Sequence, residues 1–243
     1  MLRAAEEARP MTLATGIQTH AEGSCLVRVG GTHVLCSASV EDRVPDWMRG
    51  KGVGWITSEY GMLPRSTHTR NAREAAKGRQ QGRTVEIQRL IGRSLRQALD
   101  LSVLGERQIT LDCDVVNADG GTRCASITGA WVALALALRA RGLEAALVNQ
   151  VAAVSVGILE GCPGLREGLI LDLEYEEDHR AAVDCNLVST RPMAPGSAQA
   201  LVEFQSTGEG RSFSREEATA LLDLGLRGCA ALMEAQLEAV ARG

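Results

Sequence analysis

The stretch that decides the fold is Asp119-Gly-Gly-Thr-Arg-Cys-Ala-Ser-Ile-Thr-Gly-Ala130, in which a glycine pair separates two hydrophobic patterns. Before it, residues 109–116 largely alternate between apolar and polar side chains, which is typical of a half-buried strand. After it, residues 125–139 are almost continuously apolar, which predicts a buried helix. We therefore expect a strand over about 106–117 and a helix over about 123–141, with Gly142 at its C-terminal cap.

This junction of strand, glycines and helix is a candidate anion site. The first N–H groups of a helix have no partner in the helix, and they lie at the positive end of its dipole. Arg123 adds a cation in the first turn, where acidic side chains are usual, and that arrangement suits a bound phosphate. The alternative is a tight glycine turn with a solvated arginine, and residues 119–123 alone do not decide between the two.

The residues before this stretch predict strands and one helix. Residues 24–29 and 32–40 flank Gly30-Gly31 as a β-hairpin would, and residues 55–60 predict a short strand. Residues 64–82 have no regular hydrophobic pattern and predict a long loop. A helix opening at Thr84 has one apolar face, made of Ile87, Leu90, Ile91, Leu95, Ala98 and Leu99.

The residues after it repeat the order of strands first and helix last. Strands are expected over the ranges 151–159, 168–174, 181–189 and 200–204. Ser214-Arg-Glu-Glu217 has the form of a capping box and begins a helix over roughly 214–241. The pattern predicts an α+β fold of two β-α-β lobes, residues 1–146 and 147–243, with mixed sheets and helices packed on one face.

The bulk composition is that of an ordinary globular protein: 243 residues, 45% hydrophobic and 23% charged. A net charge of −4 argues against a wholly basic nucleic-acid binder, and 3% aromatic residues argue against extended stacking platforms for bases.

Seven cysteines without paired spacing suggest reduced thiols. The first residues lack an apolar signal core, and the apolar run 130–138 is too short to cross a membrane. We expect a cytoplasmic protein with no membrane partner.

Residues 65–83 form a basic segment with a single acid, Glu74. Its six cations are Arg65, Arg70, Arg73, Lys77, Arg79 and Arg83. A solvated loop, an oligomer interface and a phosphate-binding surface are all possible, although the preference for arginine over lysine favours the last two. Arg83 differs from the others because it is a second arginine beside a helix N-terminus.

A cluster of acids follows in the second half of the chain. The alternation over 169–174 assigns Asp172, Glu174 and Glu176 to the outer face of a strand. Asp184 lies in an apolar run, where a carboxylate needs a cation or hydrogen bonds. If Asp178 lies at the turn and Asp184 on the returning strand, the two could hold one Mg²⁺ or Mn²⁺ ion.

Paired carboxylates with arginines at two helix N-termini point to phosphoryl transfer. The four histidines are scattered, so no Ser/His/Asp base is indicated. No nucleotide-triphosphatase or dinucleotide-binding glycine motif follows a strand.

Taken together, these segments resemble the ribonuclease PH family of phosphate-dependent 3′→5′ exoribonucleases, over roughly residues 9–240. The matching segments are His20–Ser24, Glu59–Arg65, Thr67–Asn71, Gly82–Arg96, Leu111–Val115, Asp119–Ala130, Leu171–Asp178 and Phe213–Glu217. The resemblance implies a ribonuclease PH fold and phosphorolysis, in which inorganic phosphate releases nucleoside diphosphates from RNA and the reverse reaction adds nucleotides. It also implies tRNA binding and the trimming of tRNA precursors, with roles in tRNA and rRNA processing.

The resemblance also implies roles for individual residues. Arg83, Gly121, Thr122 and Arg123 would hold the attacking phosphate in the first lobe. Asp178 and Asp184 would be the catalytic, Mg²⁺-binding carboxylates of the second. The family forms a hexamer, a trimer of dimers, and Arg65, Arg70 and Arg73 match positions used for assembly and RNA contact.

The N-terminal residues depart from the family pattern. A basic segment containing Asp-Gly-Arg usually precedes the Arg-Pro that matches Arg9-Pro10, whereas this chain has Met1-Leu-Arg-Ala-Ala-Glu-Glu-Ala8. The departure leaves the contacts of the N-terminal strand open. Two other functions stay open as alternatives: a catalytically silent RNA-binding ring subunit and a hydrolytic metal nuclease.

Overall fold

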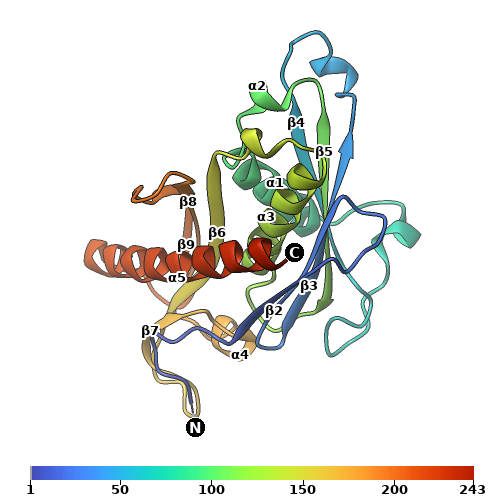
Figure 1. Ribbon diagram of the computed structural model, residues 1–243. Coiled ribbons are helices and arrows are strands. Elements are labelled where there is room, and N and C mark those ends of the chain that lie inside the picture. Colours follow the sequence, from blue (N-terminus) through green and yellow to red (C-terminus); the bar gives the residue numbers. More distant parts are fainter. Residues whose placement is uncertain (1) are drawn as a thin grey trace.

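The computed structural model describes residues 2–243 and contains two β-sheets with helices packed between and beside them (Figure 1). The first half contains β1 (Met11–Thr15), β2 (Gly23–Val29), β3 (Thr32–Glu41), η1 (Asp46–Met48), β4 (Trp55–Met62), η2 (Glu74–Lys77), α1 (Gly82–Arg96), α2 (Leu101–Leu104), β5 (Gln108–Asn117) and α3 (Thr122–Ala140). The second half contains η3 (Glu144–Ala146), β6 (Asn149–Leu159), β7 (Gly168–Leu171), α4 (Tyr175–Asp178), β8 (Val183–Pro192), β9 (Ala200–Gly208) and α5 (Arg215–Arg242).

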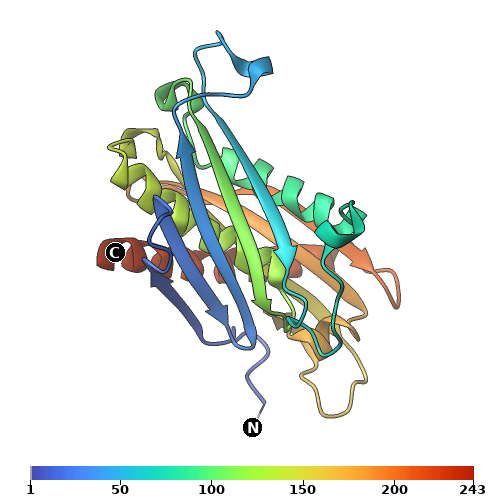
Figure 2. The same cartoon turned by 90° about the vertical axis from the view of Figure 1, so that its right-hand side faces the viewer.

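The first sheet has five strands in the order β1-β2-β3-β5-β4. It is mixed, because β4 runs parallel to β5 while the other neighbours are antiparallel. The predicted hairpin is confirmed as β2 and β3, and Gly30 in its turn has a φ of +52°. Figure 2 shows this sheet face on, with α1 and α3 behind it.

The second sheet has four strands in the order β7-β6-β8-β9 and is wholly antiparallel, so the expectation of mixed sheets holds only for the first. The long helix α5 crosses this sheet (Figure 1). Its predicted capping box is confirmed: the Glu217 N–H donates to Ser214 Oγ at 3.1 Å, and the Ser214 N–H donates to the Glu217 carboxylate at 2.7 Å.

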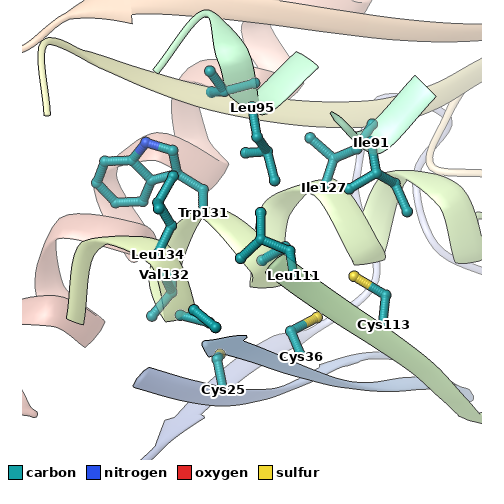
Figure 3. Packing of buried hydrophobic residues seen from close by; sticks show 14 of the residues in the cluster. Cys25, Cys36, Ile91, Leu95, Leu111, Cys113, Ile127, Trp131, Val132 and Leu134 are labelled. Carbon is teal, nitrogen blue, oxygen red and sulfur yellow. The ribbon is translucent and has the colours of Figure 1, made fainter. Parts of the chain in front are cut away.

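Helix α3 is the centre of the core. Every residue from Cys124 to Leu138 is buried, and the helix packs on both sheets. Figure 3 shows Trp131 and Leu134 of α3 among the side chains that fill this region. The indole Nε1–H of Trp131 also donates to the Asn149 carbonyl at 2.9 Å, at the first residue of β6. The α+β fold is therefore confirmed, while the division into lobes at residue 146 stays a prediction.

By length and composition α3 could also cross a membrane, but 83% of its most apolar window is buried inside the protein. A helix that is apolar all round is what a core position between two layers requires. The cysteines are consistent with this interior. All seven are free, and Cys25, Cys36 and Cys113 lie in the core beneath α3 (Figure 3).

The strand predicted over 168–174 was too long, and the face assigned to its acids was wrong. The strand ends at Leu171, because Asp172 adopts a left-handed backbone conformation with a φ of 55°. Glu174 and Glu177 then form a capping box that begins α4, so Asp172, Glu174 and Glu176 do not share the outer face of a strand. Asp178 ends α4 in the connection between β7 and β8, and Asp184 lies on the returning strand β8.

Gly129 allows the close packing of α3 on the first sheet. A Cβ at this position would lie 2.7 Å from Val27 Cγ1 and 3.0 Å from Cys36 Sγ. We expect Gly129→Ala to lower the free energy of unfolding by about 1–3 kcal/mol, despite the better helix propensity of alanine. Denaturant unfolding measures the change. Gly82→Ala, where a Cβ meets nothing within 4 Å, is the matched control, and equal stability of the two variants would contradict the packing argument.

Candidate active site

A cavity of about 500 Å³ opens between the two sheets and collects the residues that the sequence singled out. Its lining includes Arg83, Gly121, Thr122, Arg123, Asp178 and Asp184. These side chains come from α1, the N-terminus of α3, α4 and β8, so both halves of the chain contribute. The cations and the helix N-termini come from the first half, and the two carboxylates come from the second.

The other predicted arginines lie outside this cavity. Arg65, Arg70 and Arg73 are exposed on the loop between β4 and α1. Arg73 lines a neighbouring cavity that Arg83 also borders. Only residues 67–69 of this loop reach the lining of the first cavity.

The glycine pair shapes the anion-binding end of the cavity. Gly120 and Gly121 both have a left-handed backbone, with φ of +77° and +67°. Gly121 is the N-cap of α3 and offers no side chain to the first turn, so that turn keeps N–H groups for a ligand. Gly120 also has to be small, because a Cβ there would lie 2.6 Å from the Leu173 carbonyl oxygen. The loop is thus pressed against the segment that leads into α4.

Thr122 is held by a residue that the sequence did not single out. Its Oγ1 lies 2.9 Å from the hydroxyl of Tyr60, which is buried on β4. Burial raises the pKa of this phenol, so Tyr60 keeps its proton and can donate it to Thr122. The Thr122 hydroxyl then has its own proton available for an anion in the cavity.

A buried arginine fastens the glycine loop to the acidic segment. The Nε–H and the backbone N–H of Arg9 donate to Asp172 Oδ2 at 2.9 and 2.8 Å, and Nη2 donates to Oδ1 at 2.7 Å. Further bonds run from its guanidinium to the carbonyls of Asp119 and Leu173. The Arg9 and Asp172 side chains are only 4% and 8% exposed. In the sequence, the sole signal for Arg9 is its place in the Arg9-Pro10 match.

A second buried pair holds α4 itself. Arg166 donates to both oxygens of Glu177, at 2.6 and 2.7 Å. Burial alone would raise the pKa of Glu177, but the bonds from Arg166 and from the Glu174 N–H lower it below its usual value. Arg166 also donates to the carbonyls of Ala4, Ala5 and Glu7. The divergent N-terminal segment therefore has defined contacts, and they support the acidic helix.

Asp178 and Asp184 form a carboxylate pair in the cavity whose hydrogen bonding is incomplete. Asp184 Oδ1 is buried and has no hydrogen-bond partner. Burial, and then repulsion from Asp178, raises the pKa of Asp184 to about 6. Asp178 is more exposed, yet desolvation raises its pKa too, against the opposing effect of Arg123 and Arg83. A buried oxygen without a partner beside a second carboxylate is a donor set that a hard divalent cation fits.

Residues 2–243 contain no cluster of three or more His, Cys, Asp or Glu side chains suited to a metal ion. A cation here would therefore take one or two carboxylates and complete its shell with water and substrate oxygens, which is the usual arrangement for Mg²⁺.

The chain is similar to known proteins along almost its whole length. Residues 7–139 match the model of the 3′ exoribonuclease family, domain 1. The chain is 53% identical to ribonuclease PH of Roseobacter denitrificans, with 98% of each chain covered. It is 54% identical to ribonuclease PH of Caulobacter vibrioides over 98% of this chain and 97% of that one.

Solved structures with a similar fold include rice Rrp46 and archaeal exosomes. Rice Rrp46 has a TM-score of 0.73 at 19% identity, with 98% of both chains covered. The Archaeoglobus fulgidus exosome with RNA bound to its active site has a TM-score of 0.74 at 20% identity, over 96% of this chain and 90% of that chain. At these identities the likeness concerns the fold alone.

Fold and site together define a phosphate-handling enzyme in which arginines and carboxylates line the same cavity. The family match and the two relatives make the assignment specific: the chain belongs to the ribonuclease PH family. It is a phosphate-dependent 3′→5′ exoribonuclease, an enzyme of the nucleotidyltransferase type, as the resemblance in the sequence implies.

The Arg9–Asp172 pair can be tested by removing one charge. Asp172→Asn keeps the size of the side chain and a residue type that tolerates positive φ, but it leaves the Arg9 charge buried without a counter-ion. We expect the free energy of unfolding to fall by about 3–5 kcal/mol in denaturant titrations. In Arg9→Met with Asp172→Asn, part of this loss should be recovered. A stable Asp172→Asn single variant would show that the pair does not hold the loop.

Proposed function

We propose that this enzyme removes nucleotides by phosphorolysis in the cavity between the sheets, and that it acts on the 3′ extensions of tRNA precursors. The observation that supports this most directly is that six predicted residues line one cavity, where Arg83, Thr122 and Arg123 meet the carboxylates Asp178 and Asp184. An oxygen of inorganic phosphate attacks the terminal phosphodiester, and the bond from phosphorus to the 3′ oxygen breaks. A nucleoside diphosphate leaves, and the shortened RNA takes a proton on its new 3′ end.

The residues of the first half bring two anions together. Phosphate and phosphodiester repel each other, so the site has to neutralise one of them before they can approach in line. Arg83 and Arg123 supply fixed positive charge at two helix N-termini, where the helix dipole acts in the same sense. The N–H groups around Gly121 and the Thr122 hydroxyl, held by Tyr60, would orient the attacking phosphate.

The residues of the second half would hold a divalent cation. Asp178 and Asp184 are the proposed ligands for Mg²⁺ or Mn²⁺, and the unpartnered Oδ1 of Asp184 supports this assignment. When bound, such an ion would stabilise the negative charge that develops on the leaving 3′ oxygen. The buried pairs behind α4 keep the two carboxylates at this wall of the cavity.

The arginines outside the cavity suit a different role. Arg65, Arg70 and Arg73 are exposed on a loop beside the entrance, where they would contact the body of the RNA or a neighbouring subunit. We propose a homohexamer, a trimer of dimers, located in the cytoplasm and built from two lobes that divide near residue 146. Processing of rRNA would use the same chemistry.

Phosphate dependence distinguishes this function from its alternatives. A 3′-extended tRNA incubated with the protein and Mg²⁺ should release nucleoside diphosphates only when phosphate is present. Nucleoside monophosphates without phosphate would indicate a hydrolytic nuclease, and no product would indicate a silent ring subunit. Arg83→Ala should raise the KM for phosphate at least 10-fold, because it removes one fixed charge from the anion site. Arg89→Ala, on the exposed face of the same helix, is the control.

The metal assignment is tested through Asp184. Asp184→Ala should abolish turnover, while a filter-binding assay should show RNA still bound and Mn²⁺ titration should show weaker metal binding. Asp223→Ala, an exposed aspartate on α5, is the control and should leave all three measurements unchanged. A near-normal rate for Asp184→Ala would refute the role of this carboxylate.

A further inference from the structure

Helix α4 presents an aromatic ring to the cavity. Tyr175 is its first residue and lies one turn before Asp178, so both side chains reach the same cavity. Its side chain belongs to neither hydrophobic core, and the residue is 48% exposed. Among the described residues it is the one Phe, Trp or Tyr that lines this cavity. The chain has only seven Phe, Trp and Tyr residues. An exposed aromatic ring beside the residues proposed for catalysis therefore suggests a contact with the substrate.

One side of the Tyr175 ring contacts a second aromatic ring. His179 stacks on Tyr175 with ring centroids 6.0 Å apart and planes inclined by 3°. His179 does not line the cavity, so the other side of the Tyr175 ring is available to a ligand. The backbone around Tyr175 is fixed as well: its N–H donates to Asp119 Oδ1 at 3.4 Å, and Gly120 packs closely against it. The backbone of Tyr175 is therefore fixed relative to the glycine loop, and its ring contacts that of His179.

We propose that Tyr175 stacks against the base of the 3′-terminal nucleotide, the one that the reaction removes. The inference rests on the proposed function, because the phosphate residues and the carboxylates together locate the scissile phosphodiester. The base of that nucleotide is carried by the sugar next to the scissile phosphodiester, so it lies close to Asp178. Tyr175 is one helical turn from Asp178, and its ring is therefore within reach of this base. Of the described residues that line the cavity, only His68 also carries a ring, and it lies exposed on the loop between β4 and α1 rather than on α4 beside Asp178.

Stacking also suits the chemistry of a 3′ exonuclease. Such an enzyme has to accept every base that the shortening RNA presents, and stacking on an aromatic ring is tolerant of sequence because every base has a π-face. Hydrogen bonds to base edges would instead favour one base over others. A single ring at the reacting nucleotide is consistent with the low aromatic content, which excludes only an extended platform.

The first test compares KM values for RNA and for phosphate. Tyr175→Ala should raise the KM for RNA by about 5- to 100-fold and leave the KM for phosphate unchanged. Tyr175→Phe should keep the wild-type values, because it keeps the ring and loses only the hydroxyl. Trp47→Ala is the control, since Trp47 is exposed and packs edge-to-face against Trp55 at the opposite end of β4 from the cavity. A normal KM for RNA in Tyr175→Ala would overturn the inference.

The second test asks which base the ring contacts. Substrates carry a stable abasic analogue, with its hydroxyl groups intact, at either the terminal or the penultimate position. On RNA with an abasic terminal nucleotide, wild type and Tyr175→Ala should be equally slow. With the penultimate base missing, the variant should keep its full defect. An equal defect of Tyr175→Ala on all substrates would show a structural role, and its disappearance only on penultimate-abasic RNA would assign the ring to the other base.

Different results would refute the proposed function and the stacking role of Tyr175. If wild-type protein releases no nucleoside diphosphates in phosphate, the proposed function is wrong and the stacking role falls with it. If wild type is phosphate-dependent but Tyr175→Ala behaves like wild type, only the stacking role is wrong.

Discussion

The buried ion pair of Arg9 and Asp172 is the contact on which the geometry of the site depends. Arg9 reaches from the start of β1 to the carbonyls of the glycine loop, and its partner Asp172 begins the segment that becomes α4. Two buried charges are costly to remove from water, so they are stable only in close contact with full hydrogen bonding. That requirement leaves the loop and the acidic helix little freedom to move apart. The anion site and the carboxylates thereby keep one relative position.

The cost of burying charge also applies to the carboxylates that line the cavity. Two carboxylates that are desolvated and close together have raised pKa values, and a buried oxygen of Asp184 has no partner. Arg83 and Arg123 lie at helix N-termini, and their charges counteract the effect of burial on the pKa of Asp178. The Arg123 guanidinium also donates to Gln205 on β9, so this cation reaches the second sheet. The arginines therefore offset only part of the cost of burying the two carboxylates.

Local patterns accounted for much of this architecture. The alternation before Asp119, the glycine pair and the apolar run after it predicted β5, the loop and α3. The capping box at Ser214 predicted the start of α5. The strand predicted to continue to residue 174 ends at Leu171, where Asp172 has a left-handed backbone and pairs with Arg9, more than 160 residues away in sequence. The role of Tyr60 could not be predicted from the sequence for a similar reason, since only the fold brings its hydroxyl to Thr122.

The sequence by itself determined the class of fold, the helix N-termini that attract anions, and the residue types suited to phosphorolysis. These features are encoded within short windows by hydrophobic period, glycine placement and charge. Only the tertiary structure decided which of those residues meet. Arg83, Thr122 and Arg123 line one cavity with Asp178 and Asp184 because α3 packs between two sheets and its N-terminus lies close to α4 and β8. Burial, unpaired oxygens and long-range ion pairs exist only after that packing, because they depend on neighbours that are distant in the chain.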